Sequence, residues 1–271
     1  MSLADRVPST RARVLLGVGA LLVLVVAAVA FRRPPGTPGA GDRVILYGDS
    51  LSVESGGPFV EAMRRSTDAE VVTRALPGTA PCDAYDAMVA DMADPATRPD
   101  VVVIQYTGNN ATDCTQGPDG EPLTGPALAQ RYATDTAAAV ELFATQGVRV
   151  VVAGTVDAPG LPGDAEGLID DEYLRIVTQW AGRDIGRVRY APAGETVEGD
   201  GGAFVDTLPC LSGETEADGC QGGQIVVRSP DRIHFCPVVT DDLACPDYSS
   251  GAERFGSEMS RVATQALSPD Y

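Results

Sequence analysis

Downstream of residue 42, short apolar runs alternate with longer amphipathic stretches. The runs predict strands at residues 43–47, 70–74, 100–106, 148–155 and 187–192. The stretches predict helices at about residues 57–65, 85–92, 125–145, 166–182 and 251–267. The third and fourth runs, "VVVIQY" and "VRVVVAG", are almost entirely apolar, which is typical of parallel strands buried on both faces. The alternation therefore predicts an α/β domain with a mostly parallel, five-stranded sheet.

The segment from residue 194 to residue 230 departs from this alternation. It is rich in glycine, acidic residues and cysteine, and it shows little periodicity beyond "GQIVVR". A long aperiodic segment in a compact domain is usually functional or disordered, and here two cysteines are available to hold it together. It leads directly into "SPDRIHFC".

Residues 14–31 form an uncharged apolar run of 18 residues, which is long enough to span a bilayer. All six cysteines follow this run, and an even set of cysteines is typical of an exported, disulfide-bonded domain. We therefore expect a cytoplasmic segment at 1–13, a membrane anchor at 14–31, a Pro/Gly linker at 32–42 and an extracytoplasmic domain at 43–271. Ala28-Val29-Ala30 also fits a signal-peptidase site, so a cleaved and secreted form is the alternative.

The cysteines are predicted to form disulfides rather than a metal site. There is no Cys-x-x-Cys pair, and the single histidine does not have zinc-finger spacing, so no metal or cofactor is expected. Proximity in the chain favours Cys210–Cys220 and Cys236–Cys245, which leaves Cys82 with Cys114, although six cysteines allow other pairings. The net charge of −18 argues against nucleic acid as a partner.

The candidate chemistry lies where predicted strands end. The first strand runs into Gly48-Asp49-Ser50, which fits either an ordinary turn or a nucleophilic serine. A serine nucleophile needs a base near neutral pKa, and His234 is the only histidine in the chain. Asp231 precedes His234 by three residues, a spacing at which a carboxylate can orient the imidazole.

"GDSL" at residues 48–51, followed late in the chain by "DRIH", resembles the GDSL, or SGNH, hydrolases. The resemblance extends from residue 43 to about residue 266. It implies a flavodoxin-like three-layer α/β/α sandwich with strand order 2-1-3-4-5. It also implies that Ser50 is the nucleophile, His234 the base and Asp231 its orienting partner. The oxyanion hole would consist of the backbone N–H groups of Ser50 and Gly78 together with an asparagine side chain.

The third block of the resemblance is ambiguous. The family pattern is Gly-x-Asn-Asp, whereas this chain has Gly108-Asn109-Asn110-Ala111. Spacing from Gly108 favours Asn110 as the oxyanion donor, and a slip of one residue favours Asn109. A disulfide between Cys82 and Cys114 would join the loops that follow the second and third blocks.

These features predict an extracytoplasmic serine esterase that acts on an O-acyl ester of a cell-envelope carbohydrate or lipid. An O-acyltransferase would use the same Ser-His-Asp site, because both reactions share the acyl-enzyme. A non-catalytic glycan-binding module on the same fold is the alternative from another class. The expected partners are thus an acylated substrate and, through residues 14–31, a membrane.

Overall fold

The computed structural model describes residues 41–159, 166–183, 186–237, 245 and 247–268. Five parallel strands form the central sheet, in the order β2-β1-β3-β4-β5. In chain order they are β1 (Arg43–Gly48), β2 (Glu70–Ala75), β3 (Val101–Gln105), β4 (Arg149–Ala153) and β5 (Val188–Ala191). The predicted strand order is therefore confirmed.

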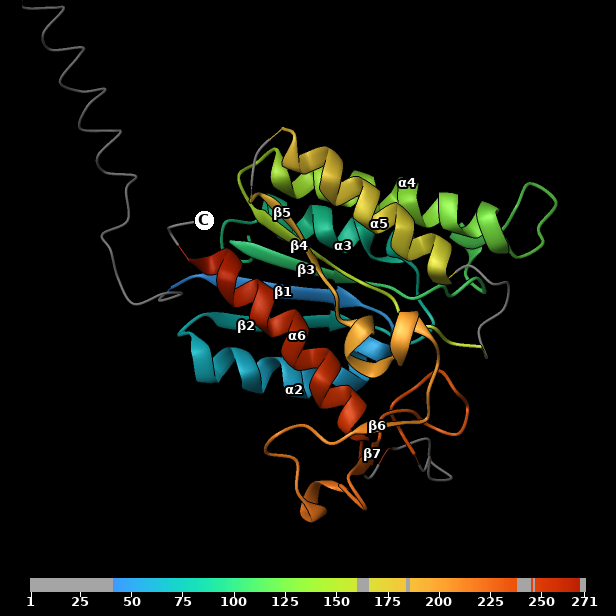
Figure 1. Ribbon diagram of the computed structural model, residues 1–271. Coiled ribbons are helices and arrows are strands. Elements are labelled where there is room, and N and C mark those ends of the chain that lie inside the picture. The colour runs from blue at the N-terminus through green and yellow to red at the C-terminus, as the bar shows by residue number, and fades with distance from the viewer. Residues whose placement is uncertain (1–40, 160–165, 184–185, 238–244, 246, 269–271) are drawn as a thin grey trace, which may run out of the picture. The chain divides into compact units, whose positions relative to one another are not determined.

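Helices cover both faces of this sheet (Figure 1). One face packs against α2 (Ser50–Ser66) and α6 (Ser250–Leu267), and the other against α3 (Pro81–Ala93), α4 (Gly125–Ala144) and α5 (Glu166–Ala181). The three-layer α/β/α sandwich is the one that the resemblance implies.

The apolar character of β3 follows from its central position. Val101 and Val103 point into the core beneath α2 and α6, whereas Val102 and Ile104 point into the core on the opposite face. Alternate side chains of a strand face opposite sides of the sheet, so the positions of a strand covered on both faces are mostly apolar.

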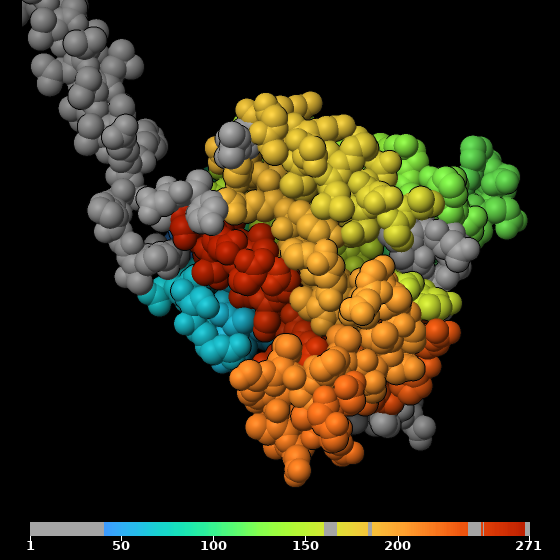
Figure 2. All heavy atoms as spheres, in the orientation of Figure 1, coloured from blue at the N-terminus to red at the C-terminus, as the bar shows by residue number. Residues whose placement is uncertain are grey.

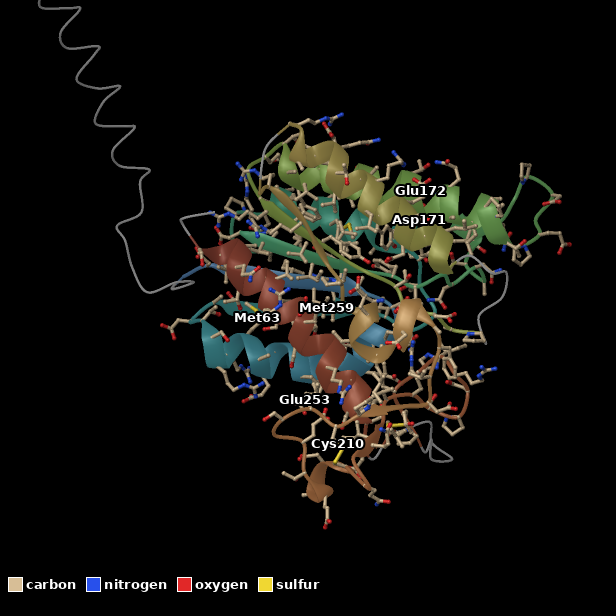
Figure 3. All side chains as sticks on the ribbon, viewed as in Figure 1. Met63, Asp171, Glu172, Cys210, Glu253 and Met259 are labelled. Carbon is tan, nitrogen blue, oxygen red and sulfur yellow. A yellow bond between two sulfur atoms is a disulfide. The ribbon has the colours of Figure 1, made fainter. Side chains whose placement is uncertain are left out.

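Close packing of α2 against α6 depends on Gly256. A Cβ atom at this position would lie 2.6 Å from the backbone oxygen of Ser55, so any larger residue would push the helices apart. Met63 of α2 and Met259 of α6, both fully buried, lie in the same core on this side of the sheet (Figure 3).

Two helices begin earlier than the sequence predicts. The helix expected near residue 57 begins at Ser50, and the one expected near residue 85 begins at Pro81. The first turns of α2 contain Ser, Gly and Pro, which are weak helix formers, and the pattern therefore conceals them. Asp49 caps α2 by accepting a hydrogen bond from Leu51 N at 3.0 Å, and Pro81 occupies a favourable first position in α3.

Between β5 and the second strand of a β-hairpin, the chain forms three 3₁₀ turns and one short strand. The 3₁₀ turns lie at Gly194–Val197, Asp200–Gly202 and Glu216–Asp218, with an earlier one at Asp113–Thr115 after β3. The antiparallel strands β6 (Thr207–Pro209) and β7 (Gln224–Val226) are joined by a loop that the Cys210–Cys220 disulfide closes. Figure 2 shows this segment, in orange, packed against one end of α6, in red.

The predicted membrane anchor at 14–31, with its flanks at 1–13 and 32–40, lies outside the described residues, so it stays a prediction. None of the helices that the structure describes combines the length and the apolar character that a membrane span requires.

Candidate active site

Ser50 lies at the junction of β1 and α2, where it is the first residue of the helix. The preceding Gly48 has no room for a side chain, because a Cβ atom there would lie 2.1 Å from Ser52 Oγ and 2.6 Å from the Gln105 oxygen. The tight passage from strand to helix brings Ser50 to the carboxyl edge of the sheet, where ligands bind in open α/β folds. The N–H groups of a first helical turn have no partner within the helix, so they favour negative charge beside Ser50.

His234 and Asp231 reach this edge from the loop that precedes α6. His234 Nε2 lies 2.8 Å from Ser50 Oγ, and His234 Nδ1 lies 2.7 Å from Asp231 Oδ2. The histidine side chain is 31% exposed, so an incoming substrate can reach it. The structure thus brings together the serine, the histidine and the aspartate that the sequence analysis selects, although 184 positions separate Ser50 from His234.

Asp231 is held as a carboxylate by the loop itself. Its Oδ1 accepts the N–H groups of Ile233 and His234, each at 2.9 Å, and the hydroxyl of Ser229. Burial acts to raise the pKa of Asp231, but the hydrogen bonds from Ser229 and His234 outweigh it and hold the pKa well below its usual range. The carboxylate therefore stays ionised beside the imidazole at neutral pH.

A buried arginine anchors this loop to the rest of the fold. Arg228 is only 2% exposed, and its guanidinium donates to the backbone oxygens of Ile233 at 3.0 Å and Asp157 at 2.9 Å. Phe204 and Phe235 lie against the same guanidinium, with its carbon 5.9 and 5.6 Å from their ring centres. These contacts fix the backbone immediately before His234.

Asp49 organises the opposite side of the site. Its buried carboxylate accepts Leu51 N at 3.0 Å, Thr107 N at 2.7 Å and Asn109 Nδ2 at 3.3 Å. Burial raises the pKa of Asp49 to about 6, while the N–H groups of Thr107 and Leu51 act in the opposite direction. Asp49 thus joins the end of β1, the start of α2 and the loop after β3.

The two asparagines of that loop point to different places. Asn109 Nδ2 donates to the backbone oxygen of Thr79 at 3.0 Å as well as to Asp49, so it lies beside the loop of Gly78. Asn110 is 8% exposed, and its Nδ2 donates to Leu123 O at 2.9 Å. The chain thus turns after Gly108 such that Asn109, and not Asn110, faces the neighbouring loop, and both asparagines stay candidates for the oxyanion donor.

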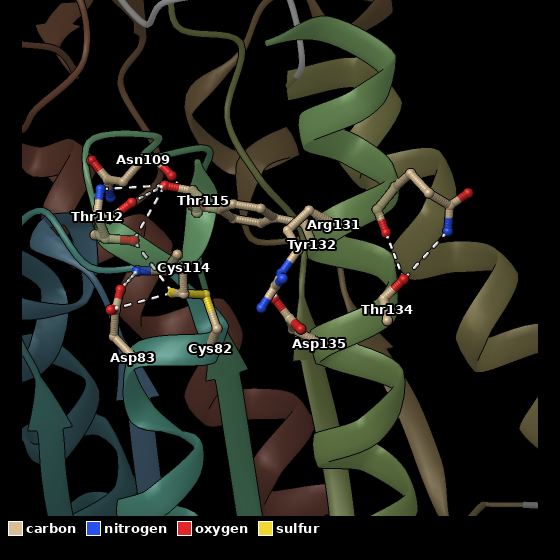
Figure 4. A network of polar contacts seen from close by, with 12 residues as sticks. Cys82, Asp83, Asn109, Thr112, Cys114, Thr115, Arg131, Tyr132, Thr134 and Asp135 are labelled. Atoms are coloured by element: carbon tan, nitrogen blue, oxygen red, sulfur yellow. Dashed lines mark hydrogen bonds and ion pairs between the residues drawn. A yellow bond between two sulfur atoms is a disulfide. The ribbon is translucent and has the colours of Figure 1, made fainter. Parts of the chain in front are cut away.

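A covalent and hydrogen-bonded network supports the loop after β3 (Figure 4). Tyr132 of α4 donates its hydroxyl to Asn109 O at 2.8 Å, and the Cys82–Cys114 disulfide joins the start of α3 to the 3₁₀ turn after this loop. Asp83 Oδ1 lies 3.3 Å from Cys114 Sγ. The possible ligand atoms of Cys82, Asp83 and Cys114 are close enough together to form a metal site. Both sulfurs are bonded to each other, so neither is a thiolate that could bind a metal ion.

The remaining predicted disulfides are also present. Cys210–Cys220 closes the loop between β6 and β7, as Figure 3 shows at Cys210, and Cys236, two residues after His234, is bonded to Cys245. The predicted pairing of all six cysteines is confirmed.

Two large hollows lie away from Ser50. One, of about 810 Å³, lies between α6 and the β6–β7 segment and is lined by Arg254, Glu253 and Leu211 among others. The other, of about 300 Å³, is acidic and lies beyond β4 and β5, with Asp170, Asp157 and Glu198 in its wall. Neither of these two hollows is lined by Ser50 or His234.

Sequence reasoning missed Asp49, Glu54 and Arg228. Asp49 precedes Ser50 in a sequence that is typical of a turn. It is the N-cap of α2, and a helix predicted to begin at Ser50 would have indicated that role. Glu54 and Arg228 resemble ordinary surface charges in the sequence, and only their tertiary contacts distinguish them.

No protein-family model matches the chain, and no curated protein sequence matches it. Among solved structures, it is similar to a protein from Bacteroides fragilis NCTC 9343 whose assignment as an acylhydrolase is itself provisional. The identity is 14%, the TM-score is 0.51, and the match covers 85% of this chain and 92% of that one.

Two further structures have lower scores. The lipase/acylhydrolase from Enterococcus faecalis is 14% identical, with a TM-score of 0.49, over 84% of this chain and 98% of that chain. The C-terminal catalytic domain of peptidoglycan O-acetyltransferase A from Streptococcus pneumoniae is 14% identical, with a TM-score of 0.48, over 84% of this chain and 94% of that domain.

The resemblance to GDSL/SGNH hydrolases is thus confirmed at the level of the fold. At 14% identity, similarity defines the fold, and the chemistry follows from this chain's own side chains.

Proposed function

We propose that this protein is a serine ester hydrolase in which Ser50 forms an acyl-enzyme. The main support is the chain of hydrogen bonds from Ser50 Oγ through His234 to Asp231, at 2.8 and 2.7 Å. A histidine in this position accepts the serine proton as general base, and the carboxylate fixes its tautomer. The geometry suits an acyl transfer better than a purely structural role, because it leaves the serine and the imidazole partly exposed.

In the proposed first step, Ser50 Oγ attacks the acyl carbon while its proton passes to His234 Nε2. The π electron pair of the C=O bond moves to the carbonyl oxygen, which becomes the oxyanion of a tetrahedral intermediate, and the imidazolium forms beside Asp231. His234 then gives the proton to the leaving alcohol as the ester C–O bond breaks, which leaves the acyl group on Ser50. Water repeats the same proton transfers and releases the acid.

The oxyanion would be stabilised by the N–H groups of Ser50 and Gly78 and by Asn109 Nδ2. Gly78 adopts φ +74, with open space beside its Cα, so its backbone can approach a ligand closely. Asn109 Nδ2 has two hydrogens: one is directed to Asp49 and the other to Thr79 O. The second is the one that an oxyanion would take over from Thr79.

A fluorophosphonate probe tests the nucleophile. The full chain should be labelled, and Ser50→Ala should not. Ser66→Ala is the matched control, since Ser66 lies at the other end of α2 and donates to Ala62 O within the helix. Equal labelling of the wild type and Ser50→Ala would reject Ser50 as the nucleophile.

For the substrate, we propose an O-acyl group on a carbohydrate or lipid of the cell envelope. This proposal rests on the predicted export of the domain and on the breadth of the resembled family. Short-chain esters, O-acetylated sugars and acylated lipids should be compared, each with and without a free sugar as acceptor. Acyl transfer to the sugar in preference to water would identify an O-acyltransferase instead.

We also propose that the domain is extracytoplasmic and anchored by residues 14–31. Three disulfides that use all six cysteines support an oxidising compartment. Protein taken from its native membrane and alkylated without reduction should show no free thiols by mass spectrometry. Six alkylated cysteines would place the domain in a reducing compartment, and a mature chain that begins after Ala30 would indicate cleavage.

A further inference from the structure

Helix α2 carries a second acid one turn after Ser50. Glu54 follows Ser50 by four residues, a spacing that places both on the same helical face. Glu54 Oε2 accepts the backbone N–H of Phe235 at 2.6 Å, and Phe235 is the residue directly after His234. The helix of the candidate nucleophile therefore holds the loop of the candidate base through a contact that is independent of the Ser50–His234 hydrogen bond.

Glu54 is only partly solvated, and its neighbours are charged or titratable. From the loop before α6 these are His234 and Asp231, and from the residues just before the helix Tyr248. Burial raises the pKa of Glu54, Asp231 adds to the rise, and the Phe235 N–H and His234 act to lower it. The pKa of Tyr248 is raised by burial and then by the charge of Glu54.

A single buried N–H does not require a carboxylate, since a glutamine oxygen would accept it at lower desolvation cost. The charge of Glu54 is thus not needed for this hydrogen bond, and the nearby group that becomes positive during the proposed reaction is His234. Asp231 meets this imidazole through a hydrogen bond at Nδ1, and Glu54 lies on its helix side, one turn from Ser50 and hydrogen-bonded to the residue that follows His234.

We propose that Glu54 is a positioning residue for His234, which fixes the backbone of its loop and favours the imidazolium by its negative charge. The inference rests on the proposed function, because it concerns the step in which the Ser50 proton moves to His234 Nε2. During that step the Nδ1 proton stays on His234, hydrogen-bonded to Asp231. The new positive charge of the imidazolium is stabilised by the carboxylates of Asp231 and Glu54. Glu54 touches no reacting atom.

The test separates the hydrogen bond between Glu54 and the Phe235 N–H from the negative charge of Glu54. Glu54→Gln retains an oxygen for the Phe235 N–H and removes the charge, whereas Glu54→Ala removes both. Glu61→Gln is the matched control, because Glu61 lies on the exposed side of the same helix and pairs with Arg65 at 3.4 Å. The full-length variants are compared for kcat and KM on para-nitrophenyl acetate as a function of pH, for the rate of fluorophosphonate labelling, and for thermal unfolding.

We expect Glu54→Gln to lose roughly three- to tenfold in kcat and in labelling rate at neutral pH, with KM unchanged. Loss of a negative charge disfavours the imidazolium, so the acid limb of the pH profile should move to lower pH. Glu54→Ala should lose more, because the loop is also released, and Glu61→Gln should behave as the wild type.

A wild-type profile for Glu54→Gln would overturn the proposal. Equal losses of kcat in Glu54→Gln and Glu54→Ala with an unshifted acid limb would also overturn it, since Glu54 would then have no electrostatic role. If Glu54→Ala fails to fold, Glu54→Gln decides alone. A wild-type chain that neither turns over the ester nor reacts with the probe would instead reject the proposed function itself.

Discussion

Asn109 donates its side-chain amide to the buried carboxylate of Asp49 at 3.3 Å, across 60 residues of sequence. The contact joins the cap of the α2 helix to the loop after β3, so it links the first helical turn to the candidate oxyanion donor. Thr107 N strengthens the same junction with a 2.7 Å hydrogen bond to the same carboxylate oxygen.

Asn109→Ala should therefore reduce kcat for ester hydrolysis by roughly a hundred- to a thousand-fold with little change in KM, as expected for loss of one oxyanion donor. Asn110→Ala should stay within about tenfold in kcat and lower the free energy of unfolding by about 1 kcal/mol, because it loses its bond to Leu123 O. Steady-state kinetics and urea unfolding measure the two effects. The reverse result would place Asn110 at the oxyanion.

Asp231→Asn should nearly abolish turnover while preserving the fold. Asp231 Oδ1 receives Ser229 and the N–H groups of Ile233 and His234, so an asparagine must place its oxygen there and its NH₂ toward His234 Nδ1. His234 would then carry its proton on Nε2 and could not accept the proton of Ser50. In serine proteases this change costs on the order of ten-thousand-fold in kcat. A loss below about tenfold would show that Asp231 does not set the tautomer.

The free energy of unfolding should carry a pH dependence from Asp49. Its pKa in the folded protein, about 6, lies above the value of an exposed aspartate, about 3.9. Between these two values the folded chain binds more protons at this site than the unfolded chain, so the contribution of Asp49 to stability increases as pH falls from about 6 to about 4.

Asp49→Asn removes this contribution. The slope of the free energy of unfolding against pH is compared between the wild type and the variant, because a loss of stability that is the same at every pH does not change that slope. Urea unfolding at several pH values between 4 and 7 should show that the wild type gains stability on acidification relative to the variant. Parallel curves for the two proteins would mean that Asp49 has an ordinary pKa in the fold.

Arg232 adopts φ +67, a conformation that glycine tolerates and other residues rarely adopt. Its guanidinium lies 4.4 Å from the ring centre of Phe204, which compensates part of the strain. Arg232→Gly should consequently be more stable than Arg232→Ala by about 1 kcal/mol, since only glycine relieves the backbone.

Arg183 provides the control for this comparison, because it too is exposed and lies against an aromatic ring, 5.2 Å from Trp180, without a positive φ. There, alanine should be at least as stable as glycine. Chemical denaturation of the four variants measures both differences. The same order at both positions would argue against strain at Arg232.

Removal of the Cys82–Cys114 disulfide should impair the site more than removal of Cys210–Cys220. The first closes a separation of 32 residues and the second one of 10, so chain entropy predicts losses of about 3–4 and about 3 kcal/mol respectively when each pair is changed to serine. Only the first joins the loops of Gly78 and Asn109. We expect kcat to fall for Cys82→Ser/Cys114→Ser and to persist for Cys210→Ser/Cys220→Ser at temperatures where both are folded.

The sheet was predictable because its signal is local and strong. β3 and β4 are buried on both faces, and their apolar runs have no other simple interpretation. The start of α2 was not, because its first turns contain residues that disfavour helices and are stabilised by tertiary contacts. Ser55, Phe59 and Met63 face α6, for example, and that partner lies almost 200 residues away along the chain.

The same distinction applies to the candidate site. Ser50, Asp231 and His234 were predictable because each stands in a short motif. The choice between Asn109 and Asn110 depends on how the chain turns after Gly108, at φ +140, and no pattern of residue types encodes that direction. Glu54 contacts the backbone of Phe235, 181 positions away, and Arg228 that of Asp157, 71 positions away, so no local signal marks either residue.

The loop of Asp231 and His234 has a consequence for how such a site can change during evolution. Four consecutive residues contain both Asp231 and His234, so the geometry between the acid and the base is set within one turn. In the proton-transfer unit, the rest of the fold has to maintain the distance from His234 to Ser50. Changes in the length of other segments, such as the long one that carries β6 and β7, would leave that turn intact. The surface around the site can thus diversify while a single short peptide preserves the proton-transfer unit.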